Sequence, residues 1–212
     1  MEQEFLKRLI SSTILIPLTI FVVIKGSVFL NFFLLSCFLI SIYEWHKMSK
    51  NKPYYILGFL FLIFSFYTVL EMTNYDGDKK YFIFILLICI CTDLGGYIFG
   101  KIFKGPKLTK ISPNKTYSGV VGSFLLPFLL ILLLIELNLF LSNFKKISIE
   151  LIFLIFLISL ISQIGDIIIS YFKRLSKIKN TGNILPGHGG LLDRIDGMIF
   201  AFPSTYIVLY LI

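Results

Sequence analysis

The side chains best suited to chemistry lie in one stretch, residues 165–197. Within it, Asp166, Ser170 and Lys173 are four and three residues apart, so a helix carries them on one face, with Arg174 beside them. A carboxylate can bind a metal ion, and neighbouring cations can neutralise phosphate groups. This combination is typical of a site that handles a metal-bound nucleotide.

A turn and a second pair of carboxylates follow in the same stretch. Residues 186–190 read Pro-Gly-His-Gly-Gly, which cannot continue a helix because proline lacks a backbone donor and glycine is conformationally free. The glycine amides could approach an anion closely, as they do in phosphate-binding loops. Asp193 and Asp196 then lie three residues apart, on one face of the next helical segment. The pattern predicts two helices that bring carboxylates to a basic, glycine-lined loop.

The order of these segments resembles the signature of the phosphatidate cytidylyltransferases, also called CDP-diacylglycerol synthases. The matching segments are Ser170, Lys173 with Arg174, 179–182, 186–190 and 193–196. Two upstream segments, 93–101 and 112–119, also resemble parts of that family. The resemblance extends from about residue 80 to residue 212, and the ordered set is far more specific than any single motif.

Two positions depart from the family pattern. Asn180 stands where the family usually has aspartate, and Ser118 stands where it usually has glutamate. Since Lys179 and Gly182 keep their spacing around Asn180, we expect position 180 to act mainly by hydrogen bonding, which an amide can do.

The resemblance implies an early step of phospholipid biosynthesis. A phosphate oxygen of phosphatidic acid would attack the α-phosphorus of CTP, giving CDP-diacylglycerol and pyrophosphate. A phosphate monoester is already a nucleophilic anion, because its second pKa is about 6. No strong protein base is needed, so the enzyme would mainly align and neutralise two anionic substrates, with Mg²⁺ as cofactor. The resemblance also favours a homodimer.

On this interpretation each predicted site residue has a role. The metal ligands would be Asp166 and Asp193, supported by Asp196 and Asp93. The phosphates would be held by Lys173, Arg174, Lys179 and Arg194. The residues closest to the chemistry would be Asp166, Asp193, Lys173, Arg174 and His188. The nucleotide or the lipid headgroup would be bound by Ser112, Lys115, Thr116, Ser170, Gly187, Gly189 and Gly190.

The composition indicates a membrane protein. Of 212 residues, 57% are apolar and 15% are charged, whereas soluble domains are roughly 45–50% apolar. No polar segment is long enough to form a separate soluble core. We therefore expect an all-α bundle that is one integrated membrane domain, with N-terminal membrane helices in 1–80 and a catalytic region in 81–212.

Seven apolar segments are long enough to approach the roughly 20 residues that a membrane-spanning helix needs. They are 6–24, 27–43, 54–71, 81–100, 119–141, 148–172 and 195–212. Most lysines and arginines fall on one side of the membrane if the N-terminus is cytoplasmic, as the positive-inside rule requires. The predicted location is a bacterial-type inner membrane, with the active site facing the cytoplasm.

The same topology brings the predicted metal ligands to one depth. Asp93 and Asp166 lie within spans near their cytoplasmic ends, and Asp193 and Asp196 open the last segment. A charge inside a span costs about 2.5–3.5 kcal/mol on insertion scales, so such residues usually face a polar cavity or a partner. The common depth favours one shared site.

Two other functions fit parts of the pattern. A CTP-dependent lipid-alcohol kinase could use a similar site, but it would have to activate a hydroxyl group, and the full series of motifs argues against it. A cation transporter would also place acids such as Asp93 and Asp166 inside spans. It would have no need for a lysine-rich glycine loop between helices.

Overall fold

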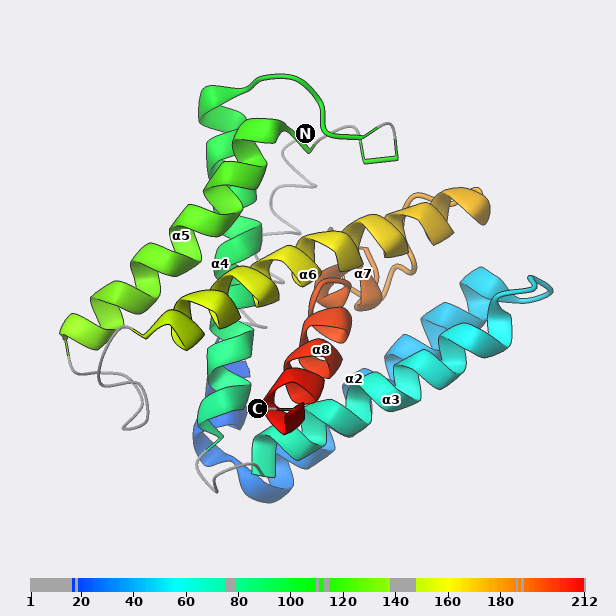
Figure 1. The fold of residues 1–212 in the computed structure, drawn as a ribbon. Coiled ribbons are helices and arrows are strands. Elements are labelled where there is room, and N and C mark those ends of the chain that lie inside the picture. Colours follow the sequence, from blue (N-terminus) through cyan, green and yellow to red (C-terminus); the bar gives the residue numbers. More distant parts are fainter. Residues whose placement is uncertain are drawn as a thin grey trace. The chain divides into compact units, whose positions relative to one another are not determined.

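The computed structural model describes residues 17, 19–74, 79–109, 111–112, 115–137, 148–185, 187 and 189–211, and helices account for most of them. The helices are α2 (Ser27–Ser49), α3 (Tyr55–Asn74), α4 (Lys80–Phe103), α5 (Tyr117–Glu136), α6 (Ile149–Leu175), α7 (Leu192–Ile195) and α8 (Met198–Leu211) (Figure 1). Within the described part, β-structure is limited to two isolated bridges, Lys107 with Thr116 and Leu185 with Gly189.

Five of these helices, α2 to α6, are long and apolar enough to cross a membrane. They correspond to the predicted segments 27–43, 54–71, 81–100, 119–141 and 148–172. The chain is therefore an all-α, multi-pass membrane protein, as the sequence predicted. The predicted segment 6–24 lies mostly outside the described residues, and the orientation of the N-terminus stays a prediction.

The last predicted segment, 195–212, is shorter in the structure. Asp196 and Gly197 separate the four-residue helix α7 from α8, which has 14 residues. The Asp196 carboxylate accepts a hydrogen bond from the Gly197 amide at 2.9 Å. Gly197 also lies against α6, where an added Cβ would be 2.3 Å from Ser162 Oγ. The total of seven spans accordingly stays a prediction.

The helices form two compact units, each built from two separate parts of the chain. The first unit contains the described residues up to Leu70 together with Phe172–Ile195, and the second contains Glu71–Tyr171 together with the chain from Asp196 onward. The two units are defined by which helices pack together. They do not test the expected division into N-terminal membrane helices, 1–80, and a catalytic region, 81–212, which stays a prediction.

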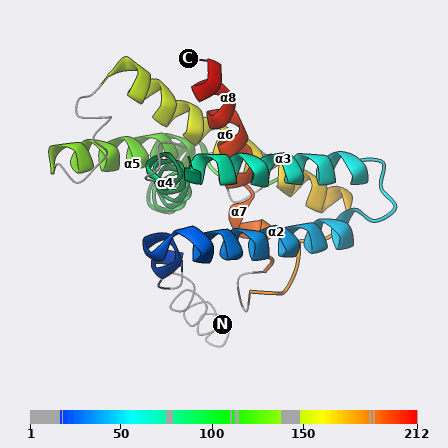
Figure 2. The same cartoon turned by 90° about the horizontal axis from the view of Figure 1, so that it is seen from below.

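The first unit is organised around Trp45 of α2, which is buried. Its indole nitrogen donates to the Tyr55 carbonyl at 3.0 Å, and its ring meets Phe172 edge to face with centroids 5.5 Å apart. Gly58 of α3 lies so close that an added Cβ would be 1.9 Å from the indole. α2 and α3 lie along each other in both ribbon views (Figure 2). Trp45 thereby joins α2, α3 and the end of α6.

In the second unit, α4 and α5 cross at glycines. A Cβ on Gly95 would lie 2.2 Å from the Gly122 carbonyl oxygen, and one on Gly119 would lie 2.7 Å from the Gly96 carbonyl oxygen. Backbones can approach this closely only where side chains are absent, which is the packing of small residues typical of membrane helices. The packing of α4 against α5 therefore depends on Gly95, Gly119 and Gly122, where a Cβ would clash with the other helix.

α6 and α8 complete the second unit. Thr92 of α4 donates to Ser159 of α6 at 3.1 Å, and the Phe82 ring stacks on Phe202 of α8 with centroids 5.5 Å apart. Gly165 of α6 faces α8, where an added Cβ would meet the Phe200 ring at 2.7 Å. These contacts fix the part of α6 that carries Asp166.

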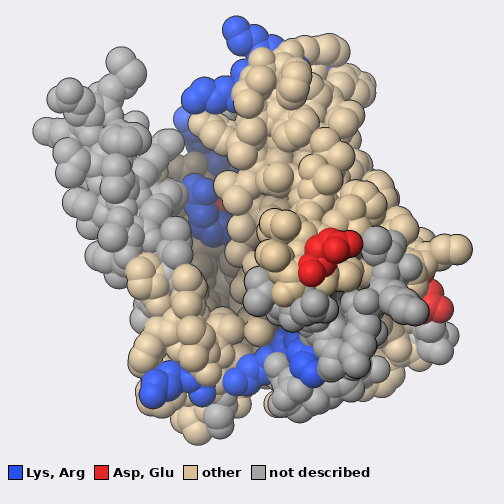
Figure 3. All heavy atoms as spheres, turned by 90° about the vertical axis from the view of Figure 1, so that its left-hand side faces the viewer, with Lys and Arg blue, Asp and Glu red and all other residues tan. Residues whose placement is uncertain are grey.

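Large apolar side chains remain exposed on all the long helices, for example Phe32, Leu57, Ile102, Leu133 and Phe153. Figure 3 shows one face, on which residues other than Lys, Arg, Asp and Glu cover most of the described surface. In a soluble protein such exposure would favour aggregation, whereas in a bilayer these side chains meet lipid.

Candidate active site

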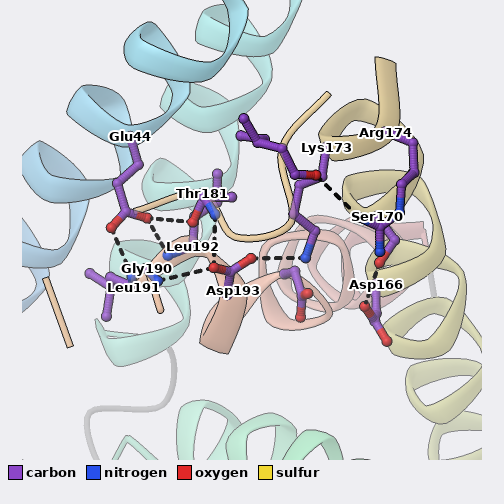
Figure 4. Close-up of polar contacts among 12 residues, drawn as sticks. Glu44, Asp166, Ser170, Lys173, Arg174, Thr181, Gly190, Leu191, Leu192 and Asp193 are labelled. Carbon is purple, nitrogen blue, oxygen red and sulfur yellow. Dashed lines mark hydrogen bonds and ion pairs between the residues drawn. The ribbon is translucent and has the colours of Figure 1, made fainter. Parts of the chain in front are cut away.

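Asp193 is held on both carboxylate oxygens. Oδ2 accepts the backbone N–H groups of Thr181 at 2.9 Å and Gly190 at 3.0 Å. Oδ1 pairs with Lys173 Nζ at 2.8 Å, and both side chains are about nine-tenths buried, with 10% and 8% exposed (Figure 4). A charged pair buried to this extent persists only when additional hydrogen bonds satisfy it. The orientation of the Asp193 carboxylate is thus set by the loop around it.

A second carboxylate, Glu44 of α2, binds the same loop. Oε2 accepts the Thr181 hydroxyl at 2.8 Å and the Leu192 amide at 2.9 Å, and Oε1 accepts the Leu191 amide at 2.9 Å. Glu44 is 1% exposed. Burying a carboxylate without donors would be very costly, so these three hydrogen bonds stabilise it in place. We call Glu44, Lys173, Thr181, 190–192 and Asp193 the loop cluster.

Glu44 is absent from the site residues predicted from the sequence, although the sequence carries a signal for it. Glu44 is the one acidic residue of α2, and an ionisable residue in an apolar span is by default a functional candidate. The predicted span ended at residue 43, whereas α2 continues to Ser49. Thr181 was matched only as part of the segment 179–182, and its contact with two carboxylates was not foreseen.

The glycines of the turn serve the loop's own packing. Gly187 and Gly189 have φ angles of 75° and 93°, in the left-handed region that favours glycine. Leu185 and Gly189 exchange both backbone hydrogen bonds, at 2.9 and 3.1 Å. An added Cβ on Gly190 would lie 2.1 Å from Thr181 Oγ1 and 2.4 Å from Glu44 Oε2. The predicted approach of these amides to a phosphate stays a prediction, and His188 lies outside the described residues.

The other predicted cations of the loop are exposed. Arg174, Lys179 and Arg194 all present their side chains at the surface of the first unit. Arg174 also donates to the Ile178 carbonyl at 3.2 Å, across the turn that ends α6. Only Lys173 is buried, in its pair with Asp193. All four were predicted to hold phosphates; the structure instead places the Lys173 ammonium against Asp193, and the phosphate contacts of the other three stay predictions.

Asp166 forms a separate group in the second unit. Its Oδ2 pairs with Lys115 Nζ at 2.6 Å, and its Oδ1 accepts the Ser170 hydroxyl at 3.3 Å. The Lys115 ammonium also donates to the Gln163 carbonyl at 3.2 Å. The predicted helical stripe of Asp166 and Ser170 is confirmed, and the structure adds Lys115 from the loop before α5. The Lys115 and Asp166 side chains are 24% and 28% exposed, so this group is less buried than the pair of Lys173 and Asp193.

Hydrogen bonds between neighbouring residues fix the shape of the loop before α5. The Thr116 hydroxyl accepts the Gly119 amide at 3.1 Å and caps α5. Ser118 donates to the Lys104 carbonyl and shares a hydrogen bond with Thr116. The Ser112 amide donates to Thr109 Oγ1 at 3.1 Å, and Ser112 accepts the Lys115 amide on its carbonyl at the same distance. The predicted contacts of Ser112 and Thr116 with substrate stay predictions.

The remaining predicted carboxylates also belong to the second unit. Asp93 lies exposed on α4, and Asp196 is buried before α8. A Cβ on Gly165 would be 2.9 Å from the Asp196 carbonyl oxygen, which places Asp196 beside the α6 segment that carries Asp166. In the described part of the chain, no three His, Cys, Asp or Glu side chains form a group able to hold a metal ion. A site shared by all four aspartates stays a prediction.

Comparison with known proteins identifies the family. Residues 52–212, which include every predicted site residue, match the sequence profile described as the Cytidylyltransferase family. The chain belongs to this family. Glu44 lies before the matched region.

Proteins named phosphatidate cytidylyltransferase align over most of the chain. The one from Rickettsia felis is 33% identical over 98% of this chain and 93% of its own length. The one from Rickettsia typhi is 30% identical over 97% and 92%. A Staphylococcus epidermidis relative is 34% identical over 88% of this chain and 69% of its own length. The resemblance first seen in the motifs is therefore confirmed as family membership.

Proposed function

We propose that this chain transfers the cytidylyl group of CTP to phosphatidic acid, producing CDP-diacylglycerol and pyrophosphate. The observation that carries the proposal is the buried pair of Lys173 and Asp193, because it lies within the matched family region and is held by the glycine loop. The named relatives support the choice of lipid substrate. The apolar helices keep the diacyl chains of such a substrate out of water.

The reaction needs positioning more than proton transfer. An oxygen of the phosphatidate phosphate forms a bond to the α-phosphorus of CTP, and the bond from that phosphorus to the α,β-bridging oxygen breaks. Pyrophosphate leaves with the electron pair. Because a phosphate monoester is anionic near neutral pH, its oxygen attacks without a protein base. The exposed Arg174, Lys179 and Arg194 would hold phosphate groups, and His188 would lie close to the reacting groups.

The donor chemistry of the aspartates fits Mg²⁺. This ion prefers oxygen ligands, keeps several waters and is usually bound by one or two carboxylates together with substrate phosphates. One or two aspartates are therefore enough to bind the ion together with the substrate phosphates. Asp166 and Asp193 would be the main ligands, with Asp196 and Asp93 in support. When bound, the ion would neutralise the charge that develops on pyrophosphate.

Cytoplasmic exposure of the site, an inner-membrane location and a homodimer belong to the same proposal. CTP is a cytoplasmic metabolite, so the basic loops 101–118 and 173–194 should face that compartment. The positive charge of these loops supports this orientation.

The test is a direct assay. Purified protein in detergent receives CTP labelled on the α-phosphate, phosphatidic acid and Mg²⁺, and the products are separated by chromatography. A labelled CDP-lipid together with pyrophosphate supports the proposal, and an Asp193→Asn variant provides the control. A parallel reaction with CTP labelled on the γ-phosphate and a lipid alcohol as acceptor tests for a kinase, which would give a labelled lipid phosphate. No transfer in either reaction would contradict both enzymatic roles.

A further inference from the structure

Two carboxylates divide the hydrogen-bond donors of one loop between them. Three consecutive amides are shared out: Gly190 donates to Asp193, while Leu191 and Leu192 donate to Glu44. At the other end of the loop, Thr181 donates its amide to Asp193 and its hydroxyl to Glu44. Both ends of the loop are therefore attached to both carboxylates (Figure 4).

The two carboxylates differ in what else they contact. Asp193 also meets the ammonium group of Lys173, and both belong to the proposed reaction machinery. Glu44 is 1% exposed, and each of its hydrogen bonds given above goes to the loop. Gly182 and Gly190 lie against its carboxylate, where an added Cβ would be 2.5 and 2.4 Å from an oxygen. Glu44 is thus enclosed by the loop, so it can act on the reaction only through it.

We infer that Glu44 is a positioning residue for the cytidylyl transfer, an inference that rests on the proposed function. It acts by holding Thr181 and residues 190–192, so that Asp193 keeps both amide donors and stays aligned with Lys173. A carboxylate is required because its two oxygens receive only donors here. In a glutamine, the NH₂ group would face a donor and one buried hydrogen bond would be lost.

The main experiment compares steady-state kinetics of the wild type, Glu44→Gln and Thr181→Val. Thr181→Val removes the hydroxyl while keeping the shape and the amide, so it breaks only the link to Glu44. Glu150→Gln is the matched control, because Glu150 is exposed at the start of α6. We expect kcat to fall about tenfold or more in Glu44→Gln, with KM for CTP and phosphatidic acid changed by less than about threefold. Thr181→Ser, which restores the hydroxyl, should recover most of the rate lost in Thr181→Val.

A second measurement reports on the loop without using activity. Trypsin can cut after the exposed Lys177 and Lys179, and cleavage there needs the loop to open. In Glu44→Gln we expect cleavage at these two sites to be faster by about threefold or more, with the other sites unchanged, when fragments are followed by mass spectrometry. Glu150→Gln should match the wild type.

The outcomes separate this inference from the proposed function. A wild type that forms no CDP-lipid contradicts the proposed function, while the trypsin measurement still tests whether Glu44 holds the loop. An active wild type with Glu44→Gln within twofold in kcat overturns the positioning role. Faster cleavage throughout the chain in Glu44→Gln, with unchanged kcat for Thr181→Val, would also overturn it, because Glu44 would then serve stability alone.

Discussion

Lys173 and Asp193 are separated by twenty residues and joined by a 2.8 Å ion pair that is almost fully buried. Lys173→Met keeps the length of the side chain but leaves the Asp193 carboxylate without its cation. We expect kcat/KM to fall at least about 100-fold, equivalent to roughly 2.7 kcal/mol. Lys177→Met, at an exposed position of the same loop, is the control and should stay within about threefold. Equal losses of kcat/KM in the two variants would show that activity depends on the total positive charge of the loop, and not on the ion pair between Lys173 and Asp193.

Asp166 and Asp193 are expected to act as one unit if they bind the same substrate-bound Mg²⁺. Asp166→Asn and Asp193→Asn should each abolish turnover, and the double variant should be hardly worse than either single one. The measurement is kcat across a Mg²⁺ titration, with insertion into the membrane checked by fractionation. Near-wild-type activity of either single variant at saturating Mg²⁺ would falsify the metal assignment.

Gly190 leaves no room for a methyl group, since its Cβ would lie 2.1 Å from Thr181 Oγ1. Gly190→Ala should therefore disturb both carboxylates and destabilise the first unit by about 1–3 kcal/mol. Gly96→Ala is a suitable control, because its nearest neighbours would be 3.7 Å away. The check is the temperature at which detergent-solubilised protein loses its monodisperse peak. An unchanged temperature for Gly190→Ala would contradict the packing described for the loop.

Asn180 lies beside Asp193 in the loop. A Cβ on Gly189 would be 3.2 Å from Asn180 Cγ and 2.9 Å from Asp193 Oδ2, so both side chains border the same point. We expect the wild type to be active and Asn180→Asp to change kcat/KM by less than about tenfold, or roughly 1.4 kcal/mol. A side-by-side assay over a Mg²⁺ titration checks this. An inactive wild type rescued by Asn180→Asp would make position 180 a metal ligand.

The topology can be tested with single cysteines. In a background without Cys37, Cys89 and Cys91, cysteines at positions 107, 145 and 179 are exposed to a membrane-impermeant reagent in intact cells. Only position 145 should be labelled, because the other two positions are predicted to be cytoplasmic. Permeabilised cells, in which all three should react, provide the control. Labelling at position 107 in intact cells would reverse the orientation.

The fold class and the five long helices could be predicted because apolar segments of about 20 residues have few alternatives. The contact between Asp166 and Ser170 followed from helical spacing alone. The pairing of Lys173 with Asp193 could not be predicted, because a turn of irregular geometry lies between them. Glu44 was missed for a related reason. Its partners lie 137 to 148 residues away, and local periodicity carries no information over that distance.

The 137 to 148 residues between Glu44 and its hydrogen-bond donors also determine when, during synthesis, Glu44 can form these hydrogen bonds. At roughly 5–20 residues per second, the ribosome adds the 137 residues between Glu44 and Thr181 in about 7–30 s. Throughout that interval α2 carries a carboxylate whose final donors do not yet exist, and a charge in lipid is costly. The nascent helix must therefore keep Glu44 in contact with water or with the insertion machinery until the end of the chain arrives. The first unit closes only after almost the whole protein has been made.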